Sequence, residues 1–92
     1  AILHGANLRK ADLRKANLTK TDLSKANLTG ANLKDADLRG SNLKEAQLEK
    51  ANLIGANLLE ANLSGARLLR TNLSGAIGLN IEGAIIDETT IF

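Results

Sequence analysis

The sequence predicts a solenoid, in which the chain winds around its own apolar core, and three observations lead to this prediction. Leucine occupies every fifth position from Leu3 to Leu73, fifteen times without exception. The residue two positions before each leucine is alanine, with the exceptions of Thr21, Ser41 and Thr71. There is no proline in the 92 residues, so every backbone N–H is available for hydrogen bonding.

A period of five fits neither regular secondary structure. In a helix, five residues turn through about 500°, so successive leucines would lie about 140° apart and form no buried stripe. In an extended strand, five is an odd step, so successive leucines would point to opposite faces. One continuous apolar interior therefore requires the chain to change direction once in every repeat.

Within each repeat, the Ala-x-Leu alternation places alanine and leucine on one side and the intervening Asn or Asp on the other. The last two positions must then form a corner. Glycine fills the final position at Gly5, Gly30, Gly40, Gly55, Gly65 and Gly75. Lysine fills the same position at Lys10, Lys15, Lys20, Lys25 and Lys50. Because lysine shares this position, we expect a turn that does not require a positive φ in every repeat.

The repeated Ala-(Asn/Asp)-Leu-x-x pattern, which runs from Ala1 to Leu73, resembles the pentapeptide-repeat proteins. The resemblance covers about four-fifths of the chain. It implies an all-β fold, a right-handed quadrilateral β-solenoid (β-helix) with four repeats in each coil. Family members often place Phe at the central position in some repeats, whereas this chain uses Leu throughout.

With four repeats per coil, residue i stacks on residue i+20, and this predicts specific neighbours. Thr21 and Ser41 share an inner column, where their hydroxyls can bond backbone carbonyls. Lys25 lies next to Glu45, and Lys15 next to Asp35, as pairs of opposite charge. The outward amides also stack and can form ladders, as at Asn32, Asn52 and Asn72.

We expect one domain, with a regular solenoid over 1–75 and a register break followed by imperfect terminal repeats over 76–92. Gly78 stands where the next leucine is due. We interpret Ala76-Ile77-Gly78 as a bulge or short loop. Repeats centred on Ile81, Ile86 and Ile91 then follow. The alternative is a frayed tail or a cap.

Composition limits the classes of site. The chain has no cysteine, which excludes disulfides and thiolate metal sites. No signal peptide or apolar run of membrane length is visible, so we expect no membrane insertion and a cytoplasmic location by default. The chain begins within the repeat pattern, at Ala1, so we expect that further coils or caps can precede it.

Charge is unevenly distributed, and this gives the first candidate site. The net charge of +2 divides into +4 over 1–25 and −2 over 26–92. The residues proposed for anion contact are Arg9, Lys10, Arg14, Lys15, Lys20 and Lys25. On the four-sided solenoid they lie on different faces, as a collar around one end, with no aromatic residue between them for base stacking. We therefore favour a solvated surface over a phosphate-binding one.

Outward apolar residues near the C-terminal end form the second candidate, a surface for contact with a partner. They are Ile54, Leu59, Leu69 and Leu79. The alternative is that they are ordinary scattered apolar residues on a protein surface. The coil ends, with unpaired backbone edges, are the third candidate, for self-association.

Nothing in the sequence indicates catalysis, a cofactor or a metal. His4 is the only histidine, and it has no evident base or nucleophile nearby in the sequence. Asp35 and Asp37 are close together, but no glycine-bearing calcium loop surrounds them. We predict no enzyme activity, no catalytic or metal-binding residues and no cofactor.

The favoured function is a non-enzymatic protein-interaction scaffold. The alternative is a DNA-mimicking binder of a type II topoisomerase that protects gyrase, as some members of the resembled family are. Mimicry needs negative charge spaced along a face, so the basic charge of this chain disfavours it. Direct binding of nucleic acid through the collar is also disfavoured.

Overall fold

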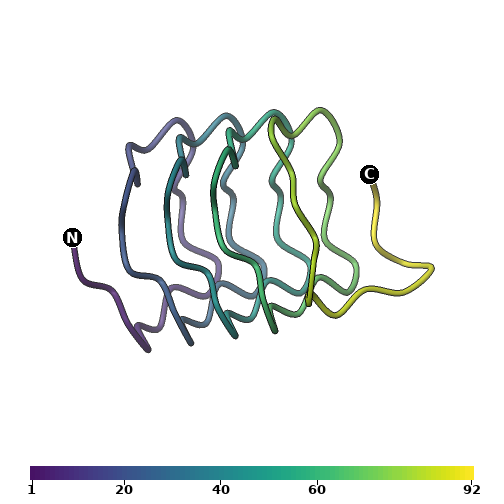
Figure 1. Cartoon of the computed structure of the whole chain (residues 1–92), viewed down its shortest axis with the longest axis horizontal. Coiled ribbons are helices and arrows are strands. Elements are labelled where there is room, and N and C mark those ends of the chain that lie inside the picture. Colours follow the sequence, from purple (N-terminus) through teal and green to yellow (C-terminus); the bar gives the residue numbers. More distant parts are fainter.

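The computed structural model describes all residues 1–92 as a stack of four-sided coils around one axis (Figure 1). Its longest dimension is 32 Å, and the other two are 24 and 22 Å. It contains no helix, and its extended pairing consists of isolated parallel bridges from Ile2↔Asp22 to Asn72↔Ile91. No helix in it could therefore cross a membrane. The all-β, right-handed quadrilateral solenoid with four repeats per coil is confirmed.

Neighbouring coils pair with an offset of twenty residues, as the stacking rule predicted. Every bridge from Ile2↔Asp22 to Asn57↔Ile77 joins residues i and i+20. The coils span residues 1–20, 21–40, 41–60 and 61–78, and 79–92 follow them. Positions 1 to 5 of a repeat are numbered below with leucine at position 3. Corners one to four are the turns that follow the first to fourth repeats of each coil.

Positions 1 and 3 form the interior. Leu33 is completely buried and Ala31 is 1% exposed, and the core extends over 20 residues from Leu18 to Leu73. Each buried leucine contributes about 1.5–3 kcal/mol relative to an exposed one. Alanine leaves room at position 1 for the turn beside it, so the narrow interior fills without large side chains at every inward position.

Every corner requires a positive φ at position 5, contrary to the prediction. All fifteen residues at this position have φ between 55° and 71°, including Lys10, Asp35 and Glu60. A hydrogen bond from the N–H of the next residue to the leucine C=O closes each turn, as from Ala6 to Leu3 at 3.0 Å. A positive φ at the third residue of such a turn characterises type II. The geometry of the corner thus overrides the side-chain preference, and lysine and glutamate accept a conformation that glycine adopts freely.

Replacing Lys25 with glycine should therefore stabilise the solenoid. Relief of the left-handed conformation should raise the free energy of unfolding by about 1–2 kcal/mol. The flexibility of glycine in the unfolded chain lowers it by about 0.5–1 kcal/mol, so the net effect is stabilising. We expect a higher free energy of unfolding in urea. Lys44→Gly is the control, because Lys44 occupies position 4 of the same corner and has no positive φ. It should be destabilising, and a shift of the same sign in both variants would contradict this account of the turn.

The Asn or Asp at position 2 caps the turn of its own repeat. From Asn7 to Asn72, each of these residues accepts a hydrogen bond from the N–H of position 4 through Oδ1, at 2.9–3.3 Å. No hydrogen bond joins the amides of neighbouring coils, so the predicted ladders are absent. The local bond satisfies a backbone donor that the turn would otherwise leave free, which explains why this position is Asn or Asp so often.

The inner hydroxyls behave differently from one another. Thr71, for which the sequence made no prediction, donates from Oγ1 to the Leu48 C=O at 2.6 Å. Thr21 donates to the Thr19 C=O at a long 3.5 Å. The Ser41 hydroxyl is buried and has no hydrogen-bond partner, so the prediction is wrong there.

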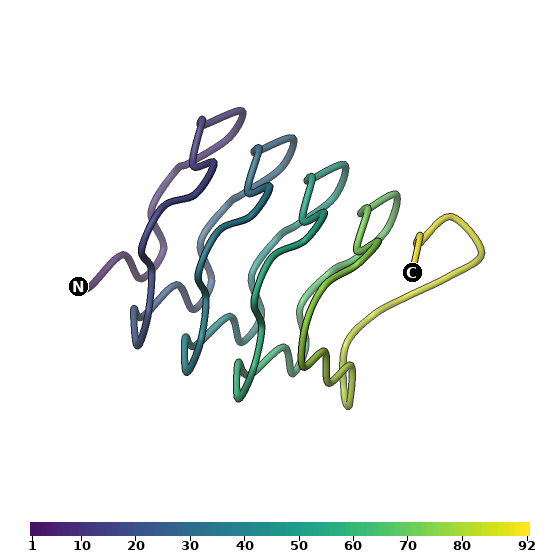
Figure 2. The same ribbon diagram turned by 90° about the horizontal axis from the view of Figure 1, so that it is seen from above.

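The last residues follow a looser path than the coils before them, and Figure 2 shows them diverge from the stack. Besides the turn bond from Ser41 to Leu38, twelve backbone hydrogen bonds join 21–40 to 41–60, whereas five join 61–78 to 79–92. Ile91 pairs with Asn72, so it occupies position 2, and Phe92 follows at position 3. The prediction that Ile91 centres the last repeat is therefore wrong, because six residues, 84–89, precede Thr90 in place of five.

Candidate functional site

The structure places the six predicted basic residues on four different corners, and all are exposed. Arg9 and Lys10 lie on corner two, Arg14 and Lys15 on corner three, Lys20 on corner four and Lys25 on corner one. They do not converge on a single site. Any site for an anion must therefore combine some of them with residues from other coils.

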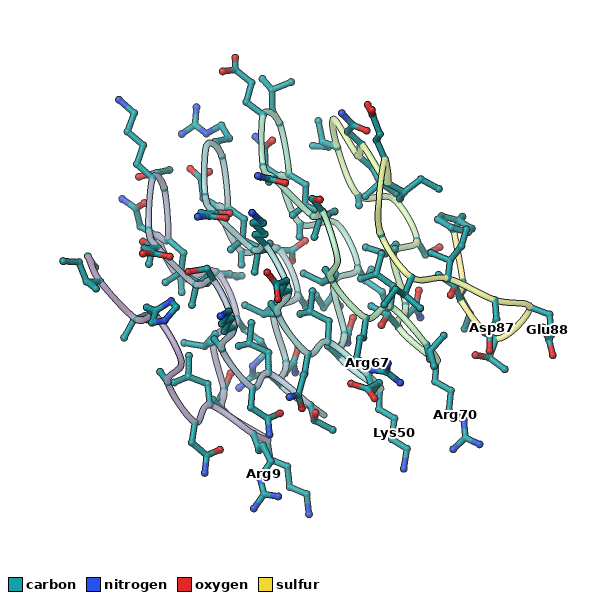
Figure 3. The ribbon with its side chains drawn as sticks, turned by 60° about the horizontal axis from the view of Figure 1, so that its bottom comes forward. Arg9, Lys50, Arg67, Arg70, Asp87 and Glu88 are labelled. Carbon is teal, nitrogen blue, oxygen red and sulfur yellow. The ribbon has the colours of Figure 1, made fainter.

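Corner two provides such a combination. Its turns contain Arg9/Lys10, Thr29/Gly30, Glu49/Lys50 and Leu69/Arg70 in successive coils. Figure 3 shows Arg9, Lys50 and Arg70 projecting from the same edge of the rod. Lys50 and Arg70 lie outside the basic segment that ends at Lys25, so the uneven charge along the sequence did not point to them. Their separation from Lys10 by multiples of twenty residues, at 50 and 70, was the signal that could have identified them.

Arginines on the other corners are neutralised by carboxylates. Arg14 pairs with Asp12 at 2.8 Å, and Arg39 pairs with Asp37 at 2.6 Å. In both cases an aspartate at position 2 faces an arginine at position 4 of the same repeat. The side-chain hydrogen bond from Arg14 is the largest cause that lowers the pKa of Asp12 to about 2.

Arg9 occupies the same position as those arginines but has Asn7 in place of the aspartate. Its guanidinium forms no ion pair, and neither does that of Arg70. Glu49, the one acidic residue in the corner-two turns of the four coils, pairs with Arg67 at 3.2 Å. Corner two therefore presents free positive charge.

The two stacked pairs of opposite charge that the sequence predicted do not form. Neither Lys25 with Glu45 nor Lys15 with Asp35 makes an ion pair. The side chain of Glu45 instead leans over the next coil, where its Cγ lies 3.0 Å from the place that a Cβ on Gly65 would occupy. Asp35 lies against Gly55 in the same way. The bare glycines offer room, and an exposed ion pair gains too little to compete.

The four predicted apolar contact residues do not form one surface. Leu59 is 48% exposed at corner four, whereas Ile54 at corner three and Leu69 at corner two are half-buried. Leu79 lies half-buried and packs against the core, because the register break turns it inward.

A second apolar group, which sequence reasoning missed, lies at the C-terminal end of the solenoid. Ile77, Ile85 and Ile91 are 56%, 44% and 50% exposed. They bridge to Asn57, Arg67 and Asn72, so all three occupy the outward position 2. We call these three isoleucines the apolar girdle. The signal in the sequence was the change from Asn or Asp to Ile at this position.

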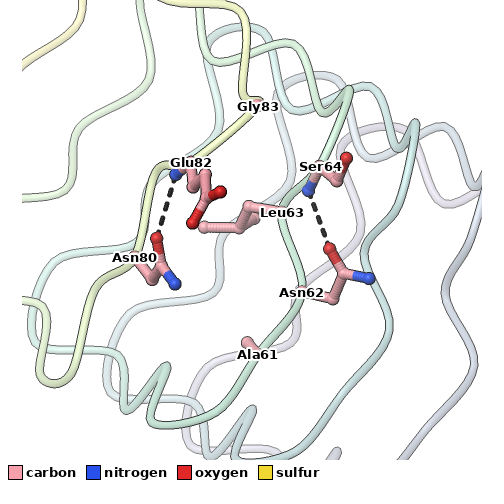
Figure 4. Close-up of a pocket in the computed structure, with 7 residues that line it drawn as sticks. All are labelled: Ala61, Asn62, Leu63, Ser64, Asn80, Glu82 and Gly83. Atoms are coloured by element: carbon pink, nitrogen blue, oxygen red, sulfur yellow. Dashed lines mark hydrogen bonds between the residues drawn. The ribbon is translucent and has the colours of Figure 1, made fainter.

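The register break also opens the wall of the solenoid. Leu63 N–H and Ala61 C=O have no backbone hydrogen bond, although the matching groups of earlier coils on that side are paired. A hollow of about 340 Å³ lies there, between the segment that contains Asn62 and the segment that contains Asn80 (Figure 4). The amides of Asn62 and Asn80 are each bound within their own repeat, to the N–H groups of Ser64 and Glu82.

A short polar chain joins His4, Ser24 and Asp22. His4 Nδ1 lies 2.7 Å from Ser24 Oγ, which donates to Asp22 Oδ1 at 2.5 Å. This bond is the largest cause that lowers the pKa of Asp22. A hydrolase triad has the histidine between the other two residues, whereas here serine is in the middle and its proton is held by the carboxylate. No group of three or more His, Cys, Asp or Glu residues is arranged to hold a metal ion.

Comparison with known proteins identifies relatives of the whole solenoid. A family model described as pentapeptide repeats matches residues 1–40 and 41–77, in eight copies. A pentapeptide repeat protein from the Arabidopsis thaliana thylakoid lumen has 31% identity and a TM-score of 0.81, over 85% of this chain and 54% of that one. Rfr23 from the cyanobacterium Cyanothece has 36% identity and a TM-score of 0.61, over 99% of this chain and 56% of that one.

The chain thus spans little more than half the length of these two solved relatives. The fluoroquinolone resistance protein QnrB1 also matches, with 22% identity and a TM-score of 0.49, which is too distant to support a functional argument. No curated protein sequence matches significantly. The family match over most of the chain and the coil geometry agree, and the chain belongs to the pentapeptide-repeat family.

Proposed function

We propose that this chain is a non-enzymatic protein-interaction scaffold that contacts its partner through the apolar girdle. The observation that supports this proposal is the exchange of polar for apolar residues at one structural position. Position 2 is Asn or Asp in most repeats, and it becomes Ile77, Ile85 and Ile91 on three sides of the C-terminal end of the solenoid. Position 2 points away from the core, so these isoleucines do not stabilise the interior. All three lie at the C-terminal end of the rod, and outward apolar residues gathered at one end favour contact with a partner there.

The gyrase-binding alternative finds no comparable support. A mimic of DNA needs a row of free negative charges along one face. Asp12 and Asp37 are bound by their own arginines, and the row of free charge on corner two is positive.

A photo-cross-linking residue in place of Ile77 tests the proposal in cells that produce the protein. We expect a discrete product, with a second copy or with another protein, that excess unlabelled wild type competes away. The triple variant Ile77→Asn, Ile85→Asn and Ile91→Asn should fail to compete, and it should still fold because asparagine is the usual residue at position 2.

The control is the same cross-linker in place of Gln47. Gln47 is also exposed at position 2, and it also lacks the hydrogen bond to its own turn. Equal products from positions 47 and 77, or no product from either, would refute the apolar girdle as the contact surface.

A further inference from the structure

The basic residues of corner two lie in a line along the solenoid axis. We call Arg9, Lys10, Lys50 and Arg70 the basic ridge. They belong to the first, third and fourth coils, and neighbouring coils are about 4.8 Å apart. The ridge therefore extends for about 14 Å parallel to the axis. In Figure 3 its labelled members lie along one edge of the molecule.

The ridge differs from the other three corners in the sign of its free charges. An acidic residue without an ion pair interrupts each of the others, namely Glu45 on corner one, Asp35 on corner three and Glu60 on corner four. On corner two, the only carboxylate in the four coils is held by Arg67. Adjacent like charges repel, and an anionic partner laid along the ridge relieves that repulsion.

Gly30 makes the ridge accessible between its two ends. It has no side chain, and the stem of Lys10 leans over it, with Cγ 3.5 Å from the place that a Cβ would occupy. The Thr29 hydroxyl is turned onto Asn27, to which it donates at 2.7 Å. The second coil therefore has a low profile, so an extended chain can pass over it from Lys10 to Lys50.

The C-terminal part of the ridge has an apolar floor. A hollow of about 310 Å³ lies between Lys50 and Arg70, and half-buried Leu69 lines it. Glu49 and Asp87 line the same hollow, and Glu49 Oε1 has no hydrogen-bond partner. The hollow thus offers cations, an apolar surface and an acceptor side by side.

These observations favour a peptide over a nucleic acid. A peptide supplies carboxylates, an apolar side chain and N–H donors together, whereas a phosphodiester backbone supplies only acceptors. The only aromatic residue of the chain is Phe92, at the C-terminal end, so the ridge has no platform on which bases could stack.

We propose that the basic ridge binds an extended acidic segment of a partner protein, with an apolar side chain of that segment placed over Leu69. At about 3.3–3.6 Å per residue, four or five extended residues cover the ridge. This inference rests on the proposed interaction function and names a second contact for it. Asp87 and Glu88 lie at the C-terminal end of the ridge and close it with negative charge (Figure 3). They favour an arrangement in which the acidic residues of the segment lie toward Arg9.

Fluorescence anisotropy of the purified chain with a labelled peptide tests the proposal. The probe is a short blocked peptide of aspartates that precede one leucine. Lys10→Gln, Lys50→Gln and Arg70→Gln together should weaken binding roughly tenfold to a hundredfold, since each exposed charge pair contributes roughly two- to fivefold. Replacing the leucine of the probe with serine should weaken binding as well, and added salt should weaken it further.

The matched control removes the same charge from other corners through Lys15→Gln, Lys20→Gln and Lys34→Gln, and it should change the affinity less than twofold. An equal loss of peptide affinity in the two triple variants would mean that binding depends only on the net charge of the protein, and it would overturn the proposal. Tighter binding of an RNA oligonucleotide at the same salt, or no binding of the peptide, would overturn it too. The asparagine variant of the apolar girdle should bind the peptide normally, so failure of the ridge and failure of the girdle are distinguishable.

Discussion

Replacing Leu33 with alanine should reduce the free energy of unfolding by about 2–5 kcal/mol, the range for removing a large aliphatic side chain from a packed core. Leu33 is completely buried in the second coil, with leucines of the first and third coils on either side in its column. The coils above and below are fixed to it by backbone hydrogen bonds, such as that from Leu33 N–H to Asn52 C=O at 2.7 Å. They cannot easily collapse into the space, so we expect a value in the upper part of the range. Equilibrium urea denaturation measures it.

Lys34→Ala is the control for this prediction. Lys34 is the next residue, at an exposed corner, and its side chain forms no ion pair. We expect a change within about 0.5 kcal/mol. Similar losses in the two variants would contradict the assignment of position 3 to the interior and position 4 to the surface.

Replacing Gly78 with alanine should detach the last residues from the fourth coil. Gly78 has φ +67°, and an added Cβ would lie 2.7 Å from the Leu59 Cα, a backbone atom that cannot move aside. The left-handed conformation costs about 1–2 kcal/mol and the overpacking about 1–3 kcal/mol. Hydrogen exchange should show the result as lost protection at Leu68 and Leu73, whose N–H groups donate to the Ile85 and Ile91 carbonyls.

Gly75→Ala separates the two contributions. Gly75 has nearly the same φ, +69°, but the nearest atom to an added Cβ is 3.8 Å away. Gly75→Ala should lower the free energy of unfolding only by the cost of the left-handed conformation. The N–H groups of Leu68 and Leu73 should remain protected from exchange. If both variants lose protection equally, steric exclusion at Gly78 does not hold the register break in place.

The two candidate surfaces illustrate why local sequence patterns identify parts of a site and not the whole. Lys10 and Lys50 are forty residues apart in the sequence, but they lie on the same corner. Only one coil lies between the coil that contains Lys10 and the coil that contains Lys50. Arg9 and Arg14 are five residues apart and lie on different corners. Proximity along the chain therefore misled the search for basic residues, because four turns of the backbone separate residues that stack.

The sequence by itself determined the solenoid. A leucine at every fifth position and an alanine two residues before it can share one interior only if the chain bends in each repeat, and this period is fully visible in the residues from Leu3 to Leu73. The offset of twenty residues followed from the family resemblance and agrees with the bridges.

Only the tertiary structure decided the conformation of the corners, the ion pairs and the path after Gly78. Corner geometry imposes a positive φ on lysine and glutamate as well as glycine, and Glu45 turns to the empty space beside Gly65 and away from Lys25. These outcomes depend on which neighbour leaves room in the next coil, and that is a property of the stacked coils and not of a single repeat.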